Sequence, residues 1–391
     1  MVELAIKSKC TGCSACCDAC PQNAILMEYD EEGFLFPHIN KELCCECGLC
    51  QKTCPTLSEE FDFKEPLSIY AGWSEDKKML KSSTSGGIFM SLCREVFSQS
   101  GVVFGAVFDD ELKLSHKSAF SENEALSMQG SKYIQSNASG AYKEAKRYLD
   151  ENKLVLFSGT PCQIDGLFHY LKKPYENLIT CEILCHGVGS TAFFEDVISE
   201  SESLNGSKAV DVKFRDKQKG WEDSQFKIIF ENGKTVSQFS YYSTFGYPFS
   251  LGYSNREYCS VCRYSSPQRI ADITLGDYSA SDKNKYSKEK RKNGISIILA
   301  STEKGKRFLE SVKGLSLEEK DASLVGESNP ALRKRNNDNK KRNHFFEVYK
   351  NEGYEAVKNT YATPPKQTVT RFKYRRQINF IYNLLKKLRL K

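Results

Sequence analysis

The chain has 391 residues, 40% of them hydrophobic, which is long enough for two or three domains that each have a core. Its formal net charge of +6 is unevenly spread: residues 331–391 hold 17 Lys and Arg against 4 acids, whereas residues 1–330 hold 39 basic residues against 46 acidic ones. No apolar run approaches the roughly 20 residues of a membrane span, and the amino terminus does not have the pattern of a signal peptide.

Cysteine usage indicates where the chain works and what it does. Sixteen cysteines in a chain without a secretion signal are expected in the reducing cytoplasm. In that compartment, clustered cysteines bind metals or take part in redox chemistry more often than they form disulfides. The sequence therefore predicts a cytoplasmic metal or redox protein.

The first 57 residues contain a cysteine motif that occurs twice. Each copy reads C-x2-C-x2-C-x3-C-P, and the second follows the first at a step of 34 residues. Three thiolates with two residues between them can converge on three corners of one iron-sulfur cube. A zinc ribbon would not need two quartets that each end in proline. The two copies are Cys10, Cys13, Cys16, Cys20 with Pro21, and Cys44, Cys47, Cys50, Cys54 with Pro55.

This repeat resembles the sequence of a two-cluster bacterial ferredoxin, in which the last cysteine of each run ligates the other cluster. The resemblance implies two 4Fe-4S clusters with crossed ligands. Cys17 and Cys45 lie outside the repeated positions and are predicted not to be ligands. The implied ligand sets are Cys10, Cys13, Cys16 and Cys54 for one cluster, and Cys44, Cys47, Cys50 and Cys20 for the other.

After an acidic linker at residues 58–66, the pattern changes to alternating strands and helices, which is typical of an α/β layer. The predicted strands cover 69–73, 102–108, 154–157, 178–184 and, as the last buried strand, 295–300. The predicted helices cover 87–99, 141–152, 165–171 and 303–312. Residues 226–239 read as a β-hairpin, because Asn232-Gly233 at their centre can supply the positive φ angles of a tight turn.

Short polar and cysteine motifs accompany these elements. Ligands in α/β sheets bind at the carboxyl ends of strands, and two of the motifs follow predicted strands directly. A C-x2-C pair also lies in a loop before a further apolar run. The motifs are Ser82-Ser83-Thr84-Ser85-Gly86-Gly87, Gly130-Ser131-Lys132-Tyr133, Ser158-Gly159-Thr160-Pro161-Cys162-Gln163, Cys185-His186-Gly187 and Cys259-x2-Cys262 before Asp272-Ile273-Thr274-Leu275-Gly276-Asp277.

In this order the motifs resemble the coenzyme F-420 hydrogenase/dehydrogenase beta-subunit family, in the form that carries a 4Fe-4S ferredoxin domain ahead of it. The likeness extends from the amino terminus to about residue 312. It implies an iron-sulfur flavoprotein that binds FAD and passes electrons between clusters and a deazaflavin or another two-electron partner. Members of the ferredoxin-fused form are associated with the synthesis of cell-surface polysaccharide.

The family resemblance also implies a third cysteine quartet. Cys162, Cys185, Cys259 and Cys262 match the family's cysteine positions, and a C-x2-C pair with two distant thiolates can hold a third 4Fe-4S cluster. A four-thiolate zinc site has the same spacing, so the metal stays open at this stage. Cys181 is treated as a neighbour of this quartet.

Flavin contacts are implied at the helix that begins near Gly87 and at three further motif residues. A glycine-rich helix start can hold a pyrophosphate on free N–H groups, although a plain serine or threonine cap would look the same. No G-x-G-x-x-G follows a strand, so a Rossmann-type site is not supported. The candidate cofactor-binding residues are Ser83, Ser85, Gly86, Gly87, Lys132, Thr160 and Gln163.

His186 is the one histidine in a motif and is the candidate catalytic residue. Its imidazole suits proton donation to a reduced substrate near neutral pH. The alternative is a structural histidine that hydrogen-bonds to the backbone beside the cluster.

Residues 364–391 contain nine Lys or Arg, no acid and interleaved apolar residues, which predicts an amphipathic helix. Such a helix binds an anionic membrane surface, or it packs on the body or on a partner subunit. Nucleic acid is not expected as a partner, because the acidic body repels a phosphate chain.

The sequence thus predicts an α+β protein with a mixed α/β flavin-binding body and a basic helical tail. The expected segments are a two-cluster ferredoxin domain at 1–57, a linker at 58–66, two family regions at 67–150 and 151–315, and an extension at 316–391. Expected partners are a redox protein or reduced coenzyme and an unidentified small substrate. The alternative function is an electron-transfer subunit without a substrate of its own.

Overall fold

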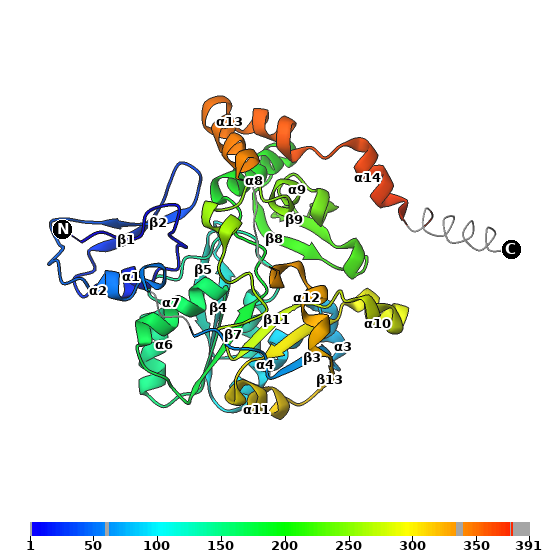
Figure 1. Cartoon of the computed structure of the whole chain (residues 1–391). Helices are drawn as coiled ribbons and strands as arrows, with labels where there is room; N and C mark the ends of the chain where they lie inside the picture. Colours follow the sequence, from blue (N-terminus) through cyan, green and yellow to red (C-terminus); the bar gives the residue numbers. More distant parts are fainter. Residues whose placement is uncertain (1, 59–61, 334–338, 376, 378–391) are drawn as a thin grey trace.

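An eight-stranded mixed sheet forms the centre of the molecule (Figure 1). The structure, a computed structural model, describes residues 2–58, 62–333, 339–375 and 377. The strand order is β13-β3-β12-β11-β7-β6-β4-β5, in which β4, β6, β7 and β11 run parallel to one another. The strands are β3 (Ser68–Ser74), β4 (Val102–Phe108), β5 (Leu114–Ala119), β6 (Val155–Gly159), β7 (Leu178–Ile183), β11 (Ile273–Asp277), β12 (Ser296–Ala300) and β13 (Leu315–Glu319).

Helices cover both faces of this sheet, which explains why its strands are continuous apolar runs. In β6, Val155 and Phe157 pack toward α6 and α7, whereas Leu156 packs toward α4 and α11. The covering helices are α4 (Ile88–Ser98), α6 (Ala141–Asp150), α7 (Pro161–Leu171) and α11 (Glu303–Ser311), with α3 (Lys77–Ser82), α5 (Glu122–Ala125) and α10 (Lys288–Asn293) at the periphery.

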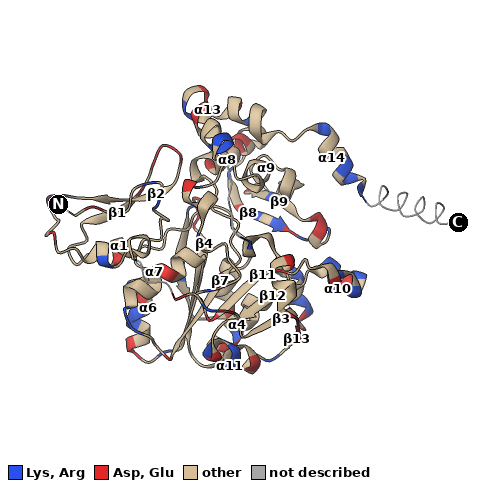
Figure 2. Cartoon of the chain, in the orientation of Figure 1, with Lys and Arg blue, Asp and Glu red and all other residues tan. Residues whose placement is uncertain are grey.

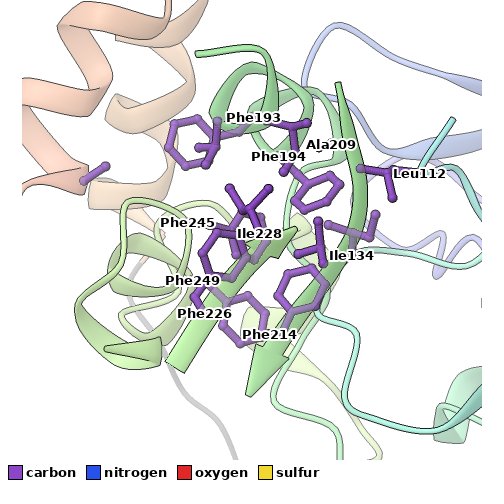
Figure 3. Packing of buried hydrophobic residues seen from close by; sticks show 14 of the residues in the cluster. Leu112, Ile134, Phe193, Phe194, Ala209, Phe214, Phe226, Ile228, Phe245 and Phe249 are labelled. Atoms are coloured by element: carbon purple, nitrogen blue, oxygen red, sulfur yellow. The ribbon is translucent and has the colours of Figure 1, made fainter. Parts of the chain in front are cut away.

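A second, three-stranded antiparallel sheet of order β10-β9-β8 lies beside the first. Its inner face shares an aromatic core with α8 and α9, in which Phe193, Phe194, Phe214, Phe226 and Phe245 pack together (Figure 3). Phe345 and Phe346 of α13 close this core from outside. The elements are β8 (Ala209–Asp216), β9 (Gln225–Phe230), β10 (Thr235–Phe239), α8 (Thr191–Asn205), α9 (Gly246–Ser250) and α13 (Lys340–Val357).

The amino-terminal region forms a small lobe on one side of the body, drawn blue in Figure 1. Its cysteines lie in short helical turns and loops before and after a two-stranded hairpin. The elements are α1 (Ala15–Asp18), β1 (Ile25–Tyr29), β2 (Leu35–Ile39), α2 (Leu49–Lys52) and the 3-10 helix η1 (Pro55–Leu57). This ferredoxin-like lobe, the α/β body and the helical carboxyl-terminal part confirm the predicted fold class.

Every strand and helix predicted between residues 69 and 312 is present, with bounds that shift by a few residues. The strand at 295–300 is the last buried strand, as predicted, because the later β13 at the edge of the sheet is only partly buried. One detail of the prediction was wrong. In the hairpin β9–β10, only Gly233 of the Asn232-Gly233 pair has a positive φ, 80°. Residues 231–234 connect the two strands, and one glycine is sufficient for this loop.

The carboxyl-terminal part continues with α12 (Val325–Ser328), α13, the π-helical turn η9 (Lys358–Ala362) and α14 (Lys366–Lys373). α14 packs on the second sheet, where Phe372 contacts Phe239 and Tyr242 with ring centroids 5.1 and 5.0 Å apart. Most of the predicted amphipathic segment after residue 375 lies outside the described residues. Within the described parts of the chain, no helix combines the length and the apolar character needed to cross a membrane.

Candidate functional site

The candidate residues of the body gather at one edge of the large sheet, where its parallel strands end. Thr160 follows β6, Cys185 follows β7, and Asp277 is the last residue of β11. The loop between α3 and α4 joins the same edge, because the N–H of Gly86 donates to Ser296 Oγ at 3.0 Å. This is the edge at which α/β sheets bind ligands.

The first predicted cysteine set is assembled in the amino-terminal lobe. Burial raises the pKa of Cys10, Cys13 and Cys16, to about 12 for Cys13, and the neighbouring thiol of Cys54 raises each of them further. The N–H of Gly12 donates to Cys10 Sγ at 3.4 Å. A crossing cysteine thus lies beside the first three cysteines of the other run, as the resemblance implied.

The second set lines a small hollow of about 20 Å³ near the outer end of the lobe. Four of the residues that line it are Cys20, Cys44, Cys47 and Cys50, together with the non-repeated Cys45 and an apolar wall. The N–H of Ala24 donates to Cys20 Sγ at 3.3 Å. The predicted ligand set and the lining of the hollow therefore coincide in all four cysteines.

The third set lies at the carboxyl edge of the sheet. Burial raises the pKa of Cys162 well above its usual value, and Cys185, Cys262 and Cys13 raise it further as neighbours. Cys259 belongs to the adjacent 3-10 helix η5 (Glu257–Val261), and its Cβ would lie 3.4 Å from a Cβ placed on Gly187. All four predicted residues are thus brought together.

The thiol composition of these sets suits iron-sulfur clusters. Among the residues that the structure describes, no three His, Cys, Asp or Glu side chains are arranged to hold a single metal ion. A 4Fe-4S cluster places its four thiolates around the corners of a cube, so its ligands need to be neighbours without sharing one point. The N–H groups that donate to sulfur, including Gly187 to Cys185 at 3.4 Å, also suit cluster thiolates.

The cysteines outside these sets have other surroundings. Cys17 donates its thiol proton to the carbonyl of Ile25 at 3.0 Å, which suits a non-ligand. Cys93 and Cys181 are buried together in the hydrophobic cluster under α4, on the face of the sheet that Leu156 also faces. Cys181 therefore packs away from Cys162, which belongs to the cluster on the opposite face.

The lobe is fixed to the body next to Cys13. Tyr142 of α6 donates to the Cys13 carbonyl at 2.6 Å, and a Cβ on Gly166 of α7 would lie 3.1 Å from Cys13 Sγ. Arg256, which is 2% exposed, donates to the Cys10 carbonyl at 2.8 Å. Because Cys13 also neighbours Cys162, the first and third cysteine sets face each other across this contact.

Asp18 makes three hydrogen bonds between lobe and body. Its carboxylate accepts backbone N–H groups of Gly140, Tyr142 and Lys143 at 2.6 to 3.2 Å, so it caps α6 from the other region of the chain. The sequence prediction missed Asp18 and Arg256. A local signal exists only for Arg256, which stands three residues before Cys259.

The two loops of the predicted flavin site contact each other. Gln129 Nε2 donates to Ser83 Oγ at 2.8 Å, and the Ser131 N–H donates to Thr84 Oγ1 at 3.2 Å. Helix α4 begins after Gly87, whose φ is 81°, and no side chain caps it. The plain serine or threonine cap that the sequence left open is therefore absent, and the first N–H groups of α4 lack a side-chain acceptor.

Other predicted cofactor residues are engaged by the protein itself. Lys132 Nζ donates to the carbonyls of Met128, Gln129 and Gly130 at 3.0 to 3.4 Å, and burial lowers its pKa to about 8. Ser85 Oγ donates to the Ile295 carbonyl at 3.1 Å. A lysine held this way, with a lowered pKa, is a positioned group rather than a solvated surface cation.

Thr160 and Gln163 form the capping box of α7. Gln163 also donates to the Ser136 carbonyl at 3.1 Å, so its side chain connects α7 to the loop before α6. Thr160 Oγ1 lies 3.2 Å from Cys162 Sγ. The geometry therefore relates both residues to the third cysteine set, and a direct flavin contact stays a prediction.

Two histidines lie near this edge in different environments. His186 follows Cys185 and is exposed, so its predicted proton-donating role stays a prediction. His116, which the sequence prediction missed, is buried between Ser136 Oγ at 2.5 Å and the Ser158 carbonyl at 2.9 Å. Burial lowers the pKa of His116 to about 4, so its imidazole is neutral at physiological pH.

A buried ion pair connects this edge of the large sheet to the second sheet. Arg215 of β8 pairs with Asp277, and Trp221 Nε1 donates to the same carboxylate at 3.0 Å. Burial opposes ionisation of both partners, yet their mutual attraction raises the pKa of Arg215 and lowers that of Asp277. Lys217 Nζ donates to the Ser85 carbonyl at 2.7 Å, which connects this group to the loop before α4.

Comparison with known families gives two matches along the chain. Residues 152–323 match the model of the coenzyme F420 hydrogenase/dehydrogenase beta subunit, carboxyl-terminal region. Residues 9–57 match the model of the 4Fe-4S dicluster domain. The segment 9–57 contains the two cysteine runs, and the segment 152–323 contains the third cysteine quartet.

Three individual proteins align with parts of this chain. An uncharacterised protein of Methanocaldococcus jannaschii is 25% identical over 266 residues, which cover 59% of this chain and 71% of that protein. An uncharacterised ferredoxin of the same organism is 36% identical over 56 residues, 14% of this chain and 71% of its own length. A chain of the F420-reducing NiFe hydrogenase complex from Methanosarcina barkeri aligns at 16% identity and a TM-score of 0.46, over 78% of this chain and 94% of that one.

Proposed function

Because this chain belongs to the coenzyme F420 hydrogenase/dehydrogenase beta-subunit family and carries a 4Fe-4S dicluster domain ahead of the family region, we propose that it is an iron-sulfur flavoprotein oxidoreductase. In this proposal it moves electrons between 4Fe-4S clusters and FAD, and exchanges them with a two-electron small molecule.

The observation that carries the proposal is the serial arrangement of the cysteine sets. The set around Cys50 lies at the outer end of the lobe, the set around Cys13 lies at the contact with the body, and Cys13 neighbours Cys162 of the third set. A chain of adjacent one-electron sites is what a redox relay requires. A structural zinc site at Cys162 would interrupt such a relay, because zinc is not redox-active.

The residues of this chain would hold the cofactors as follows. The thiolates of the three sets would ligate the clusters, with the N–H groups of Gly12, Ala24 and Gly187 donating to ligand sulfurs. The uncapped start of α4 and the adjoining loop of Lys132 would hold phosphate groups of FAD. FAD, when bound, supplies the exchange between one-electron and two-electron chemistry.

Anaerobic purification with cofactor analysis tests the proposal. We expect about twelve irons and as many acid-labile sulfides per chain, since three 4Fe-4S clusters contain that number, together with one FAD. Eight irons with one zinc and no flavin would contradict both the third cluster and the flavin. A Cys181→Ser variant is the matched control for Cys162→Ser, because both are cysteines at the central sheet and only Cys162 belongs to the third set.

The second candidate function is that of an electron-transfer subunit that serves a partner enzyme. The exposure of Cys47 near the surface of the lobe favours electron exchange with a docked protein. Reduced deazaflavin, NADH, NADPH and reduced ferredoxin should each be offered, and the oxidised flavin absorbance followed. Bleaching by a small reductant supports the enzyme, whereas bleaching by reduced ferredoxin alone supports the subunit.

Two finer predictions come from the sequence only. A place in cell-surface polysaccharide synthesis follows from the family resemblance. Peripheral attachment to an anionic membrane follows from the basic residues after Pro365. Liposome flotation of the whole chain and of a variant that ends at residue 363 tests the attachment, and equal flotation would contradict it.

A further inference from the structure

A second hollow opens between the small sheet, the 3-10 helix η3 (Trp221–Asp223) and helix α14. It has a volume of about 370 Å³ and is open to solvent. Its wall consists of Arg215, Trp221, Glu222, Tyr241, Lys283, Phe372 and Arg375. The last two residues lie beyond residue 323, where the match to the beta-subunit family model ends. This hollow is therefore completed by a part of the chain that the family match does not cover.

Cations of this wall are held in fixed positions. Arg215 is buried and anchored by Asp277, while its Nε has no hydrogen-bond partner in the part of the chain that the structure describes. Arg375 donates to Asp223 Oδ1 at 2.6 Å, and its guanidinium lies 3.8 Å from the centroid of the Phe372 ring. Because planar guanidinium groups match phosphate and carboxylate geometry, two anchored arginines favour an anionic ligand.

The aromatic residues of the wall supply flat surfaces. Lys283 Nζ lies 5.8 Å from the centroid of the Trp221 ring, and Phe372 is fixed against Tyr242. A partly exposed tryptophan, tyrosine and phenylalanine around one hollow suit a ligand that contains a ring, which stacks on such surfaces.

The mouth of the hollow is basic. Helix α10 carries four Lys or Arg against one acid and contacts η3, and α14 carries three against none. Figure 2 shows both helices largely blue on the same side of the molecule. Glu222 is the one carboxylate of the wall itself. The surrounding charge therefore attracts anions toward the hollow and raises their local concentration.

We propose that this hollow binds a phosphate-bearing ring compound, with Arg215, Lys283 and Arg375 contacting the phosphate groups and the aromatic residues stacking on the ring. Two sources share this chemistry. One is a separate phosphorylated small molecule. The other is the flavin dinucleotide, whose phosphates would then lie here and not at the start of α4, because a Cβ on Gly294 would lie 2.8 Å from Trp221 Cδ1 and 3.1 Å from Ser85 Cα. The site does not depend on the identity of the redox substrate.

Isothermal titration of the anaerobically purified holoprotein tests the site with three probes. ADP combines a ring with phosphates, adenosine lacks the phosphates, and inorganic phosphate lacks the ring. We expect ADP to bind more tightly than either of the other two probes. We expect Lys283→Ala to lower the affinity for ADP at least about tenfold, because it removes a charge-assisted contact. Lys285→Ala is the matched control, since Lys285 is an exposed lysine of the same 3-10 helix and does not line the hollow.

A second pair of variants distinguishes a separate phosphorylated molecule from the flavin dinucleotide, and its control variant shows whether a loss of binding is due to misfolding. Arg375→Ala removes a cation of the wall, whereas Arg371→Ala removes an exposed cation of the preceding helix α14 that does not line the hollow. If the FAD content falls only in Arg375→Ala, the ligand is the flavin; if FAD is retained and ADP affinity falls, it is a separate molecule. Unchanged ADP affinity and FAD content in both Lys283→Ala and Arg375→Ala would overturn the proposal, while the iron and flavin analysis above would still stand.

Discussion

The amino-terminal lobe and the α/β body are stabilised by different means. The lobe's own buried cluster consists of Cys16, Ile25 and Cys50, so two of its three members are predicted cluster ligands. The body instead has large clusters of aliphatic and aromatic side chains on both faces of its sheet. A region of about 57 residues with so little apolar burial needs metal or docking contacts to fold. The lobe therefore depends on its cofactors and on the body, whereas the body does not depend on the lobe in the same way.

Removal of iron is expected to have the largest effect on the difference in stability between the lobe and the body. After oxidation and chelation, we expect proteases to cut within residues 2–58 at least about tenfold faster, because that region loses its main source of local stability. The body should keep its near-ultraviolet circular dichroism, which reports its aromatic core. Protein held under the same conditions without oxidant or chelator is the control. Simultaneous loss of both regions would contradict the contrast.

Replacement of single cysteines distinguishes predicted cluster ligands of the body from cysteines of its core. Cys162→Ser should lower the iron content by about four atoms, the content of one 4Fe-4S cluster, because it removes a ligand of the third set. Cys181→Ser should keep the full iron content, since Cys181 is a core residue beside Cys93. Iron analysis and the electron paramagnetic resonance of the reduced protein measure the effect. Full iron content in Cys162→Ser would remove Cys162 from the ligand set.

The same contrast explains what the sequence could predict. The first three cysteines of each run could be predicted as neighbours because their spacing is local. The crossing pairs, with Cys54 beside Cys10 and Cys20 beside Cys50, were implied by the resemblance to two-cluster ferredoxins and not by spacing. The apolar runs predicted the central strands for the same reason. Their hydrophobic pattern is local and continuous.

Features that join distant segments could not be predicted. Asp18 caps a helix that begins more than 120 residues later, and β13 pairs with β3 from the other end of the chain. The sequence prediction also had no means to place Arg375 beside Trp221 or to find His116. In each case the partner is set by packing of the whole fold, and the isolated residue looks like an ordinary polar side chain.

Asp18 tests the contact between the two regions. Asp18→Asn should lower the free energy of unfolding by about 2 kcal/mol, because a buried carboxylate that accepts three N–H bonds is replaced by an amide that presents donors to them. Glu28→Gln removes an equal charge at an exposed position of the same lobe and should have little effect. Urea unfolding with hydrogen exchange at the start of α6 measures both. Equal effects of the two variants would argue against the cap.

The smallest expected effect is the pH dependence contributed by His116 of the body. Its folded-state pKa of about 4 lies below the ordinary value of about 6.5, so the unfolded chain takes up a proton at a pH where the folded chain does not. Stability from the neutral imidazole is therefore present above pH 6.5 and is lost as the pH falls toward 4, by about 2 kcal/mol between pH 7 and pH 5. The difference in unfolding free energy between the parent protein and His116→Asn should shrink by that amount over this range, and His38→Asn, at an exposed position, is the control. A parallel pH dependence in the parent and His116→Asn would show that His116 is not held in its neutral form.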